Sequence, residues 1–399
     1  MRQYAIIAIL FPVIVLLTGC WDQRELGEIT VVTGMAVDKG EDDKYVLTVE
    51  GINATELNKQ TASGFAPSIV YSAEGNSLAE LTYRVNEGIS RHLIYSHMRT
   101  LIIGEELAKE GIIDFIDFLE RNREIRDDFN ILVARGLRGS DILRVTYQFQ
   151  KSSSLKLHTQ LETMMKDWGG DPGVRMNDVI RAWTSPGRQP VMAAVTIMGD
   201  PSEGLSSENM KKVTPDALVI IDSLAIFKGD QLVGYLSLEN SRNYLWIQDK
   251  LIKTSLTVKC DEDRFMGLRI YNTKTWNEGK IQGGKPVINI HIRAEAFVDG
   301  THCNNEFEKA NTYLQNEESA EKHLKDTISN TIKNVQEEFE ADIFGFGEVV
   351  QRQDYKNFKK IQDKWDQNFA EADVKIDTTI VIRRTGIRTK SFLTEVKEQ

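Results

Sequence analysis

The sequence predicts a mixed α/β protein of three domains, in which antiparallel or mixed sheets are packed by helices. Two kinds of pattern predict this fold class. Apolar and polar residues alternate at 45–49 and 288–296, as they do in half-buried strands. Apolar residues recur three or four positions apart at 78–89 and 324–339, which is the spacing of an amphipathic helix. Strands and helices therefore occur together in each part of the chain.

The elements expected along the chain fall into three regions with approximate boundaries, and the first two regions could interleave. Region 20–150 should contain strands at 29–37, 45–49, 68–73, 100–103 and 131–134, and helices at 76–92 and 107–119. Region 151–255 should contain helices at 155–165, 176–182 and 241–248, a strand at 191–198, and a hairpin whose apolar first strand, 217–227, is central and covered on both faces. Region 256–399 should contain a strand at 288–296, a long helix broken at Gly345 and Gly347, a helix at 355–369 and a closing strand at 374–382.

The N-terminus has the proportions of a lipoprotein signal peptide. One positive charge precedes an apolar stretch at 4–17, which is shorter than the roughly 20 residues that span a bilayer. The stretch ends in a lipobox, L-T-G-C at 17–20, whose cysteine thiol can receive a diacylglyceryl group. An ordinary signal peptide with a chance cysteine, or an uncleaved helix, is the alternative. We expect residues 1–19 to be removed and Cys20, carrying S-diacylglycerol and an N-acyl chain, to anchor the protein to a membrane.

Composition limits the partners of the remaining chain. Apolar residues make up 41% of the sequence and charged residues 27%, which is typical of a globular protein. The net charge of −10 disfavours nucleic acid as a partner, because phosphate contacts need clustered lysine and arginine. Two cysteines follow Cys20, and outside the cytoplasm Cys260 and Cys303 could form a disulfide or remain unpaired thiols.

No catalytic, cofactor or metal motif stands out in the sequence. A phosphate-binding G-x-x-x-x-G-K-[ST] loop, an H-E-x-x-H zinc helix and a G-x-S-x-G elbow are all absent. We therefore expect no catalytic residue, cofactor or metal site. Simpler roles are expected for the residues that could suggest such sites: a solvated turn for Asp261, Glu262 and Asp263, loop hydrogen bonding for His92, His97 and Arg99, core packing for Trp365 and Phe369, and partial exposure for Trp246.

Residues 17–26, L-T-G-C-W-D-Q-R-E-L, resemble the N-terminus of the Ger(x)C lipoproteins, the C subunits of spore germinant receptors. That family typically has G-C-W-D-x-R-E-L followed by a strand like residues 31–39. Further similar stretches follow in order over essentially the whole mature chain, at 103–108, 121–126, 225–236 and 341–347, with Trp365 downstream.

The resemblance implies a three-domain subunit held by Cys20 on the outer face of the spore inner membrane. Such a subunit works beside an integral-membrane A subunit and a transporter-like B subunit in the response to small nutrients. The resemblance implies that the membrane subunits recognise the nutrient, so neither a nutrient pocket nor a catalytic residue is expected here. The turn at 342–347 could contact a partner, but packing at a helix end is the stronger interpretation.

Three hypotheses of function follow. The leading one is a non-catalytic, membrane-anchored subunit needed for receptor assembly and the germination response. The alternative is a substrate-binding lipoprotein of a transport system, which should have a cleft between two lobes. The third is a cell-envelope enzyme, which would require polar residues converging in a pocket.

Overall fold

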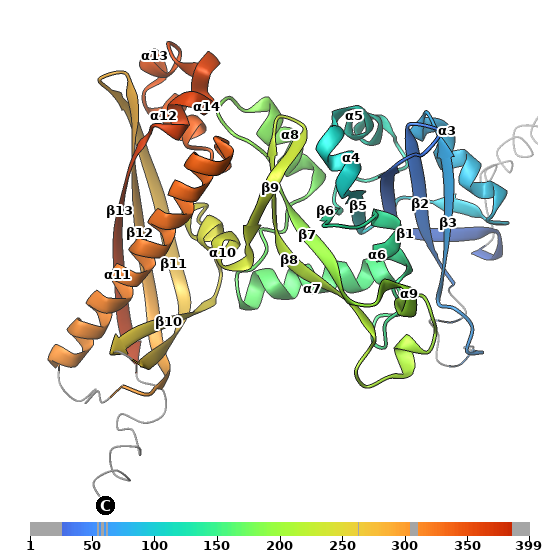
Figure 1. The fold of residues 1–399 in the computed structure, drawn as a ribbon, viewed down its shortest axis with the longest axis horizontal. Helices are drawn as coiled ribbons and strands as arrows, with labels where there is room; N and C mark the ends of the chain where they lie inside the picture. Colours follow the sequence, from blue (N-terminus) through green and yellow to red (C-terminus); the bar gives the residue numbers. More distant parts are fainter. Residues whose placement is uncertain are drawn as a thin grey trace, which may run out of the picture.

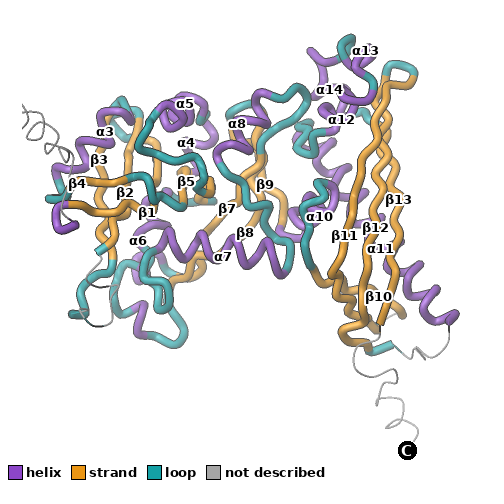
Figure 2. The backbone as a smooth tube through the Cα atoms, turned by 180° about the vertical axis from the view of Figure 1, so that it is seen from behind, coloured by secondary structure: helices purple, strands orange, loops and turns teal. Residues whose placement is uncertain are grey.

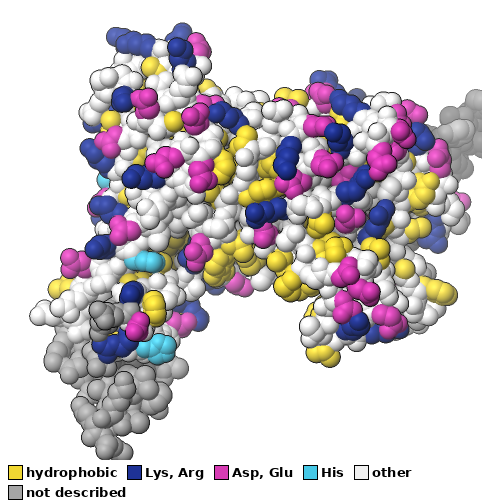
Figure 3. Space-filling view, in the orientation of Figure 1, with side chains coloured by type: hydrophobic (Ala, Val, Ile, Leu, Met, Phe, Trp, Pro, Cys, Tyr) yellow, Lys and Arg dark blue, Asp and Glu magenta, His cyan; other side chains and the backbone are white. Residues whose placement is uncertain are grey.

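The computed structural model describes residues 26–384, apart from 54–55, 57–59, 61–62, 262 and 304–309. The molecule is elongated and contains a nine-stranded sheet and a four-stranded sheet, which lie toward opposite ends of its long axis (Figure 1). Basic and acidic side chains are intermixed over the visible face of both halves (Figure 3). The mixed α/β fold class predicted from the sequence is confirmed.

The nine-stranded sheet has parallel strands at its centre and antiparallel strands at both edges. Its order is β3-β2-β1-β5-β6-β7-β8-β9, with β4 beside the start of β1. The four strands β1, β5, β6 and β7 run parallel to one another. The bounds are β1 (Ile29–Lys39), β2 (Tyr45–Ile52), β3 (Ser68–Gly75), β4 (His92–Ile94), β5 (Thr100–Gly104), β6 (Asn130–Ala134), β7 (Val191–Gly199), β8 (Ala217–Lys228) and β9 (Gln231–Ser237).

Helices cover both faces of this sheet (Figure 2), which explains why β1 is apolar along most of its length. On one face, Met35 packs in the same apolar cluster as Leu107 and Phe115 of two surface helices. On the other face, Ala36 packs in a cluster with Leu157. The helices are α3 (Leu78–Arg84), α4 (Glu105–Glu110), α5 (Ile113–Arg121), α6 (Gly139–Arg144), α7 (Ser153–Asp167), α8 (Met176–Thr184), α9 (Pro201–Gly204) and α10 (Leu238–Ile247).

The four-stranded sheet, in the order β10-β11-β12-β13, is covered on one face by a long helix (Figure 1). β10, β11 and β12 are antiparallel, whereas β13 runs parallel to β12. The helix that crosses between them packs Leu324, Ile328 and Ile332 into the core. The bounds are β10 (Thr254–Asp261), β11 (Arg264–Gln282), β12 (Lys285–Thr301), α11 (Ala310–Asn334), a π-helical turn (Val335–Phe339), α12 (Phe346–Gln353), α13 (Tyr355–Phe358), α14 (Trp365–Ala370) and β13 (Asp373–Arg384).

The nine-stranded sheet takes strands from both of the first two predicted regions. β1 to β6 precede residue 150 and β7 to β9 follow it, so one sheet spans this predicted boundary. The second sheet starts at Thr254, close to the start predicted for the C-terminal region. The domain boundaries themselves stay predictions.

The helix predicted at 76–92 is wrong in its second half. α3 ends at Arg84, a 3₁₀ turn (Val85–Glu87) follows, and His92 lies in β4. Leu93 of β4 pairs with Thr30, so this segment is drawn into the sheet beside β1. Tertiary pairing overrides the helical spacing here.

The helices after α11 also differ from expectation. The long helix ends before the glycines that were expected to break it, because Glu340 adopts a left-handed conformation with φ 48°. The helix predicted at 355–369 is divided into α13, a 3₁₀ turn (Gln362–Lys364) and α14, since the backbone leaves helical geometry at Ile361. The apolar spacing survives because α13 and α14 pack Phe358, Trp365 and Phe369 on the same core.

Candidate functional site

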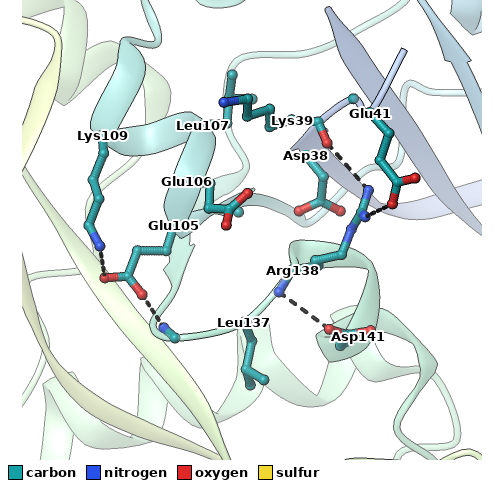
Figure 4. A pocket seen from close by; sticks show the side chains of 13 residues that line it. Asp38, Lys39, Glu41, Glu105, Glu106, Leu107, Lys109, Leu137, Arg138 and Asp141 are labelled. Atoms are coloured by element: carbon teal, nitrogen blue, oxygen red, sulfur yellow. Dashed lines mark hydrogen bonds and ion pairs between the residues drawn. The ribbon is translucent and has the colours of Figure 1, made fainter. Parts of the chain in front are cut away.

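A cavity of about 590 Å³ lies where β1, β5 and β6 end (Figure 4). These strands are parallel, and ligands of open α/β sheets bind at the carboxyl ends of such strands. The cavity is lined by the segments that follow the three strands: Asp38, Lys39, Gly40 and Glu41; Gly104, Glu105, Glu106, Leu107 and Lys109; and Gly136, Leu137, Arg138 and Asp141. Its position at the carboxyl ends of parallel strands makes this cavity a candidate functional site.

Asp38 fills the position that an anionic ligand would take at this edge. Its carboxylate is buried and accepts hydrogen bonds from the backbone N–H groups of Gly139, at 2.6 Å, and Ser140, at 3.0 Å. Burial raises the pKa of Asp38, and these two N–H donors act in the opposite direction. Phosphates bind helix N-termini through free N–H groups of this kind. Because Asp38 already occupies them, the first turn of α6 is not a phosphate site.

Replacing Asp38 by alanine should lower the free energy of unfolding by about 2 kcal/mol, because two buried N–H groups lose their acceptor. Urea unfolding followed by circular dichroism measures the change. Asp42→Ala, at an exposed aspartate in the turn after β1, is the matched control and should change stability little. Equal stability of the two variants would contradict the role given to Asp38.

The other charged groups of the cavity are paired mostly with one another. Lys109 lies 2.9 Å from Glu105, which also accepts a hydrogen bond from the N–H of Gly136. Partial burial acts to raise the pKa of Glu105, but the hydrogen bonds from Lys109 and Gly136 lower it overall. In Figure 4 the carboxylate of Glu106 points into the cavity. The lining contains no histidine, serine or cysteine, so it assembles no nucleophile–base pair of the common hydrolase types.

A second buried carboxylate, Glu50 of β2, joins the sheet to α7. It accepts hydrogen bonds from the backbone N–H groups of Ser153, at 2.8 Å, and Ser154, at 3.0 Å, and from the hydroxyl of Ser152 at 3.0 Å. Glu50 thus caps the N-terminus of α7, where a negative charge is favourable. All of these groups are buried, which indicates a structural role.

A third buried carboxylate, Asp342, organises the turn between the long helix and α12. It accepts hydrogen bonds from the backbone N–H groups of Phe346, at 3.1 Å, and Gly347, at 2.8 Å, and from the indole N–H of Trp365 at 2.9 Å. Burial raises the pKa of Asp342 to about 6, while the three donors, which favour the charged form, act to lower it.

This turn fastens the two halves of the molecule together. Gly347 packs against Gly187 of the first half so closely that a Cβ on Gly347 would lie 2.6 Å from the Gly187 Cα atom. Nearby, the N–H of Gln189 donates to the carbonyl of Asp342 at 2.8 Å, and Arg188 lies 3.2 Å from Glu348. The turn is buried inside the protein, so the packing interpretation holds and an exposed partner contact does not.

The remaining candidate residues are scattered. Trp365 and Phe369 lie in the core as predicted, but Trp246, expected to be partly exposed, is only 1% exposed. α10 begins at Leu238, earlier than expected, and packs the face that carries Trp246 inward. His92 and His97 lie in a strand and a turn, and Arg99 is 3.9 Å from Asp128. Within the described ranges, no group of three potential ligands could hold a metal ion.

Of the three cysteines, only Cys303 has a described side chain. It is buried and disulfide-bonded. Cys20 and the side chain of Cys260 lie outside the described residues, as does Glu262 of the acidic turn, so lipidation of Cys20 and pairing of Cys260 with Cys303 stay predictions. No helix in the described part of the chain combines the length and apolarity needed to cross a bilayer.

Comparison with known families decides the identity of the fold. The model of the spore germination protein N-terminal domain matches residues 22–197, and the model of the spore germination B3/GerAC-like C-terminal domain matches residues 222–386. The chain belongs to the Ger(x)C family of spore germination proteins. The two family models match in order along the chain. The first match ends within β7 and the second begins within β8, and both strands belong to the first sheet.

Relatives from Bacillus subtilis (strain 168) align over nearly the full length of this family member. Spore germination protein KC is 26% identical and the alignment covers 100% of this chain and 99% of that protein. Spore germination protein B3 is 23% identical, with 97% and 99% covered. The crystal structure of the GerBC protein has the same fold, with a TM-score of 0.55 and 19% identity over 88% of this chain and 96% of that one.

Proposed function

We propose that this Ger(x)C protein is a non-catalytic, lipid-anchored subunit of a spore nutrient germinant receptor, needed for receptor assembly and the germination response. The observation that carries the proposal is the match to both family models over residues 22–197 and 222–386. The relatives it aligns with are themselves named as spore germination proteins.

The polar groups of the structure support a binding role over a catalytic one. Asp38, Glu50 and Asp342 are each buried with backbone N–H donors from a neighbouring element, so they serve the fold. Catalytic groups would instead face a pocket with free polar atoms. The cavity at the edge of the first sheet is lined from that sheet alone, which also speaks against the two-lobed cleft of a substrate-binding lipoprotein.

The proposal places the protein on the outer face of the spore inner membrane, held by the lipids on Cys20. Its partners are the integral-membrane A and B subunits of the receptor. The lipobox supports the anchor, and the net charge of −10 disfavours nucleic acid as a partner.

Cys20→Ala tests the anchor and the function together. Spores carrying this variant should lose the protein from the inner-membrane fraction, and their nutrient germination rate should fall at least tenfold. Germination by a non-nutrient trigger should be unchanged. Immunoblots of membrane fractions and the loss of optical density during germination measure the two effects.

The matched control is Gln23→Ala, three positions beyond the lipobox, which should behave as the wild type. Deleting the gene should reproduce the Cys20→Ala phenotype. Normal nutrient germination of the deletion strain, with no paralogue compensating, would show that the proposed function is wrong.

A further inference from the structure

Three loops on one side of the first half carry apolar side chains that the fold leaves uncovered. Phe149 is 95% exposed and Val213 is 98% exposed, and Phe65 is 73% exposed. Leu205 and Met198 add two more exposed apolar side chains nearby in sequence. We call the loops at 63–67, 145–151 and 198–216 the apolar loop surface. Single exposed apolar residues are common, but several on adjoining loops indicate an interaction surface.

Hydrogen bonds between the loops make them a single surface. The hydroxyl of Thr146 donates to the carbonyl of Ser206 at 2.8 Å, and the side-chain amide of Gln148 donates to the carbonyl of Lys212. These bonds place Phe149 and Val213 on neighbouring segments. Figure 3 shows apolar side chains at the outer end of the lobe that carries α9.

The loop that carries Phe65 is tied to the same lobe. The ammonium group of Lys151 donates to the carbonyl of Glu56 at 2.9 Å. The carboxylate of Glu56 in turn accepts hydrogen bonds from the N–H groups of Ser63 and Gly64, each at 3.0 Å. The backbone just before Phe65 is therefore held in place by its own loop and by the 145–151 loop.

The start of β1 lies beside this surface. Thr30 lines a groove of about 480 Å³ together with Phe65 and Ile69. An extended chain spans at most about 3.6 Å per residue, so Cys20 can lie no more than about 22 Å from Leu26, where the described chain begins. Lipids on Cys20 therefore bring a bilayer close to the first strand and to the loop that carries Phe65.

The charges of the surface favour apolar insertion over attraction to anionic headgroups. Lys211 pairs with Glu208 at 2.6 Å and Lys212 with Asp216, while Lys151 donates to the carbonyl of Glu56 and the acidic residues of 198–216 outnumber the lysines. No excess of positive charge remains there to bind lipid phosphates. The apolar side chains project singly from loops, and the interfacial layer of a bilayer can accept such side chains without a preformed groove.

We propose that the apolar loop surface, led by Phe149 and Val213, inserts into the interfacial layer of the bilayer that holds Cys20. The inference rests on the lipid anchor of the proposed function and adds a second, protein-based contact. Two contacts fix the orientation of the molecule, whereas a single attachment through Cys20 would leave it free to rotate. The far half, with the four-stranded sheet, is then held in a defined position for other subunits.

Quenching by brominated lipids tests the contact. Full-length lipidated protein is reconstituted into vesicles of phosphatidylcholine and phosphatidylglycerol, with or without bromine near the headgroup end of the acyl chains. Tryptophan is introduced by Phe149→Trp, and the signal of the six native tryptophans is subtracted with the wild type. The matched control is Tyr355→Trp, at a side chain 58% exposed on α13, at the opposite edge of the molecule in Figure 1.

The added fluorescence at position 149 should fall at least twofold in brominated vesicles, while that at position 355 should not change. Equal quenching at the two positions, or no quenching at position 149, would overturn the inference. Failure of the protein to co-sediment with the vesicles would also overturn it. If position 149 is unquenched in a protein that stays on the vesicles and supports germination, the inference fails and the proposed function stands.

Discussion

The free energy of unfolding of an Asp342→Ala variant is expected to fall by about 4 kcal/mol, since an unsatisfied buried donor costs about 1–3 kcal/mol. Three N–H donors, from Phe346, Gly347 and Trp365, converge on this carboxylate, and alanine offers them no acceptor. The protein interior there is too closed for water to replace the lost bonds, because Asp342 is fully buried. Denaturant unfolding followed by tryptophan fluorescence measures the change.

Two further variants sharpen this test. Asp342→Asn keeps the shape and one acceptor oxygen but turns an N–H₂ group toward donors, so it should lose about half as much stability. Asp363→Ala, at an exposed aspartate, should be neutral. A loss below about 1 kcal/mol for Asp342→Ala would show that the three hydrogen bonds do not hold the turn.

The same residue predicts a pH dependence. The pKa of Asp342 is raised to about 6 from an ordinary value of 3.8, so the folded protein keeps its proton at a pH where the unfolded chain has lost it. Stability from this group is therefore full below about pH 4 and is lost as the pH rises to about 6. Asp171, whose pKa burial raises to about 7, adds a slope of the same sign. The test is the difference in free energy of unfolding between the wild type and Asp342→Asn, measured as a function of pH. This difference should change between about pH 4 and pH 6 and stay constant above about pH 6.

The second large effect is expected at the contact between the two halves. A Cβ on Gly347 would lie 2.6 Å from both the Cα atom and the carbonyl oxygen of Gly187, and 2.9 Å from a ring carbon of Trp365. Backbone atoms cannot move aside as a flexible side chain can, so Gly347→Val must push the halves apart. We expect a loss of about 3 kcal/mol in the free energy of unfolding. Limited proteolysis should also cut faster in the segments that join the halves.

Gly300→Val is the matched control, because no heavy atom lies within 4 Å of a Cβ at that position of β12. It should unfold at nearly the same denaturant concentration as the wild type. If Gly347→Val and Gly300→Val were equally stable, the close backbone contact could not be what joins the two halves.

Patterns along single strands allowed much of the fold to be predicted. The alternation at 288–296 identified β12, whose inward residues Ile288, Ile290 and Ile292 pack in the core. The neighbouring β11 was not predicted, because two of its inward positions are Thr275 and Gly279. A β-bulge after Ile270 also shifts its inward face by one residue, which hides the alternation.

Features that depend on distant segments were beyond prediction. The spacing of Tyr355 to Phe369 is helical, yet the segment bends at Ile361, and α13 and α14 each pack on a core that other segments complete. The cavity beside Asp38 is formed by three strand ends that are remote in sequence. For Asp342 the sequence indicated only a helix end with glycines, and the donor Trp365 and the contact Gly187 come from opposite directions along the chain.

The order of strands in the first sheet has a consequence for how the chain can fold. From β1 onward, each newly made strand of the series β5, β6, β7, β8 and β9 adds to the edge left by the strand before it. These strands can therefore join the sheet in the order in which they are synthesised, and no strand pair has to separate to admit a later strand. At every stage one strand edge stays open to wrong partners until the next strand arrives. Pausing between β6 and β7, which lie more than fifty residues apart, is then the step most exposed to aggregation.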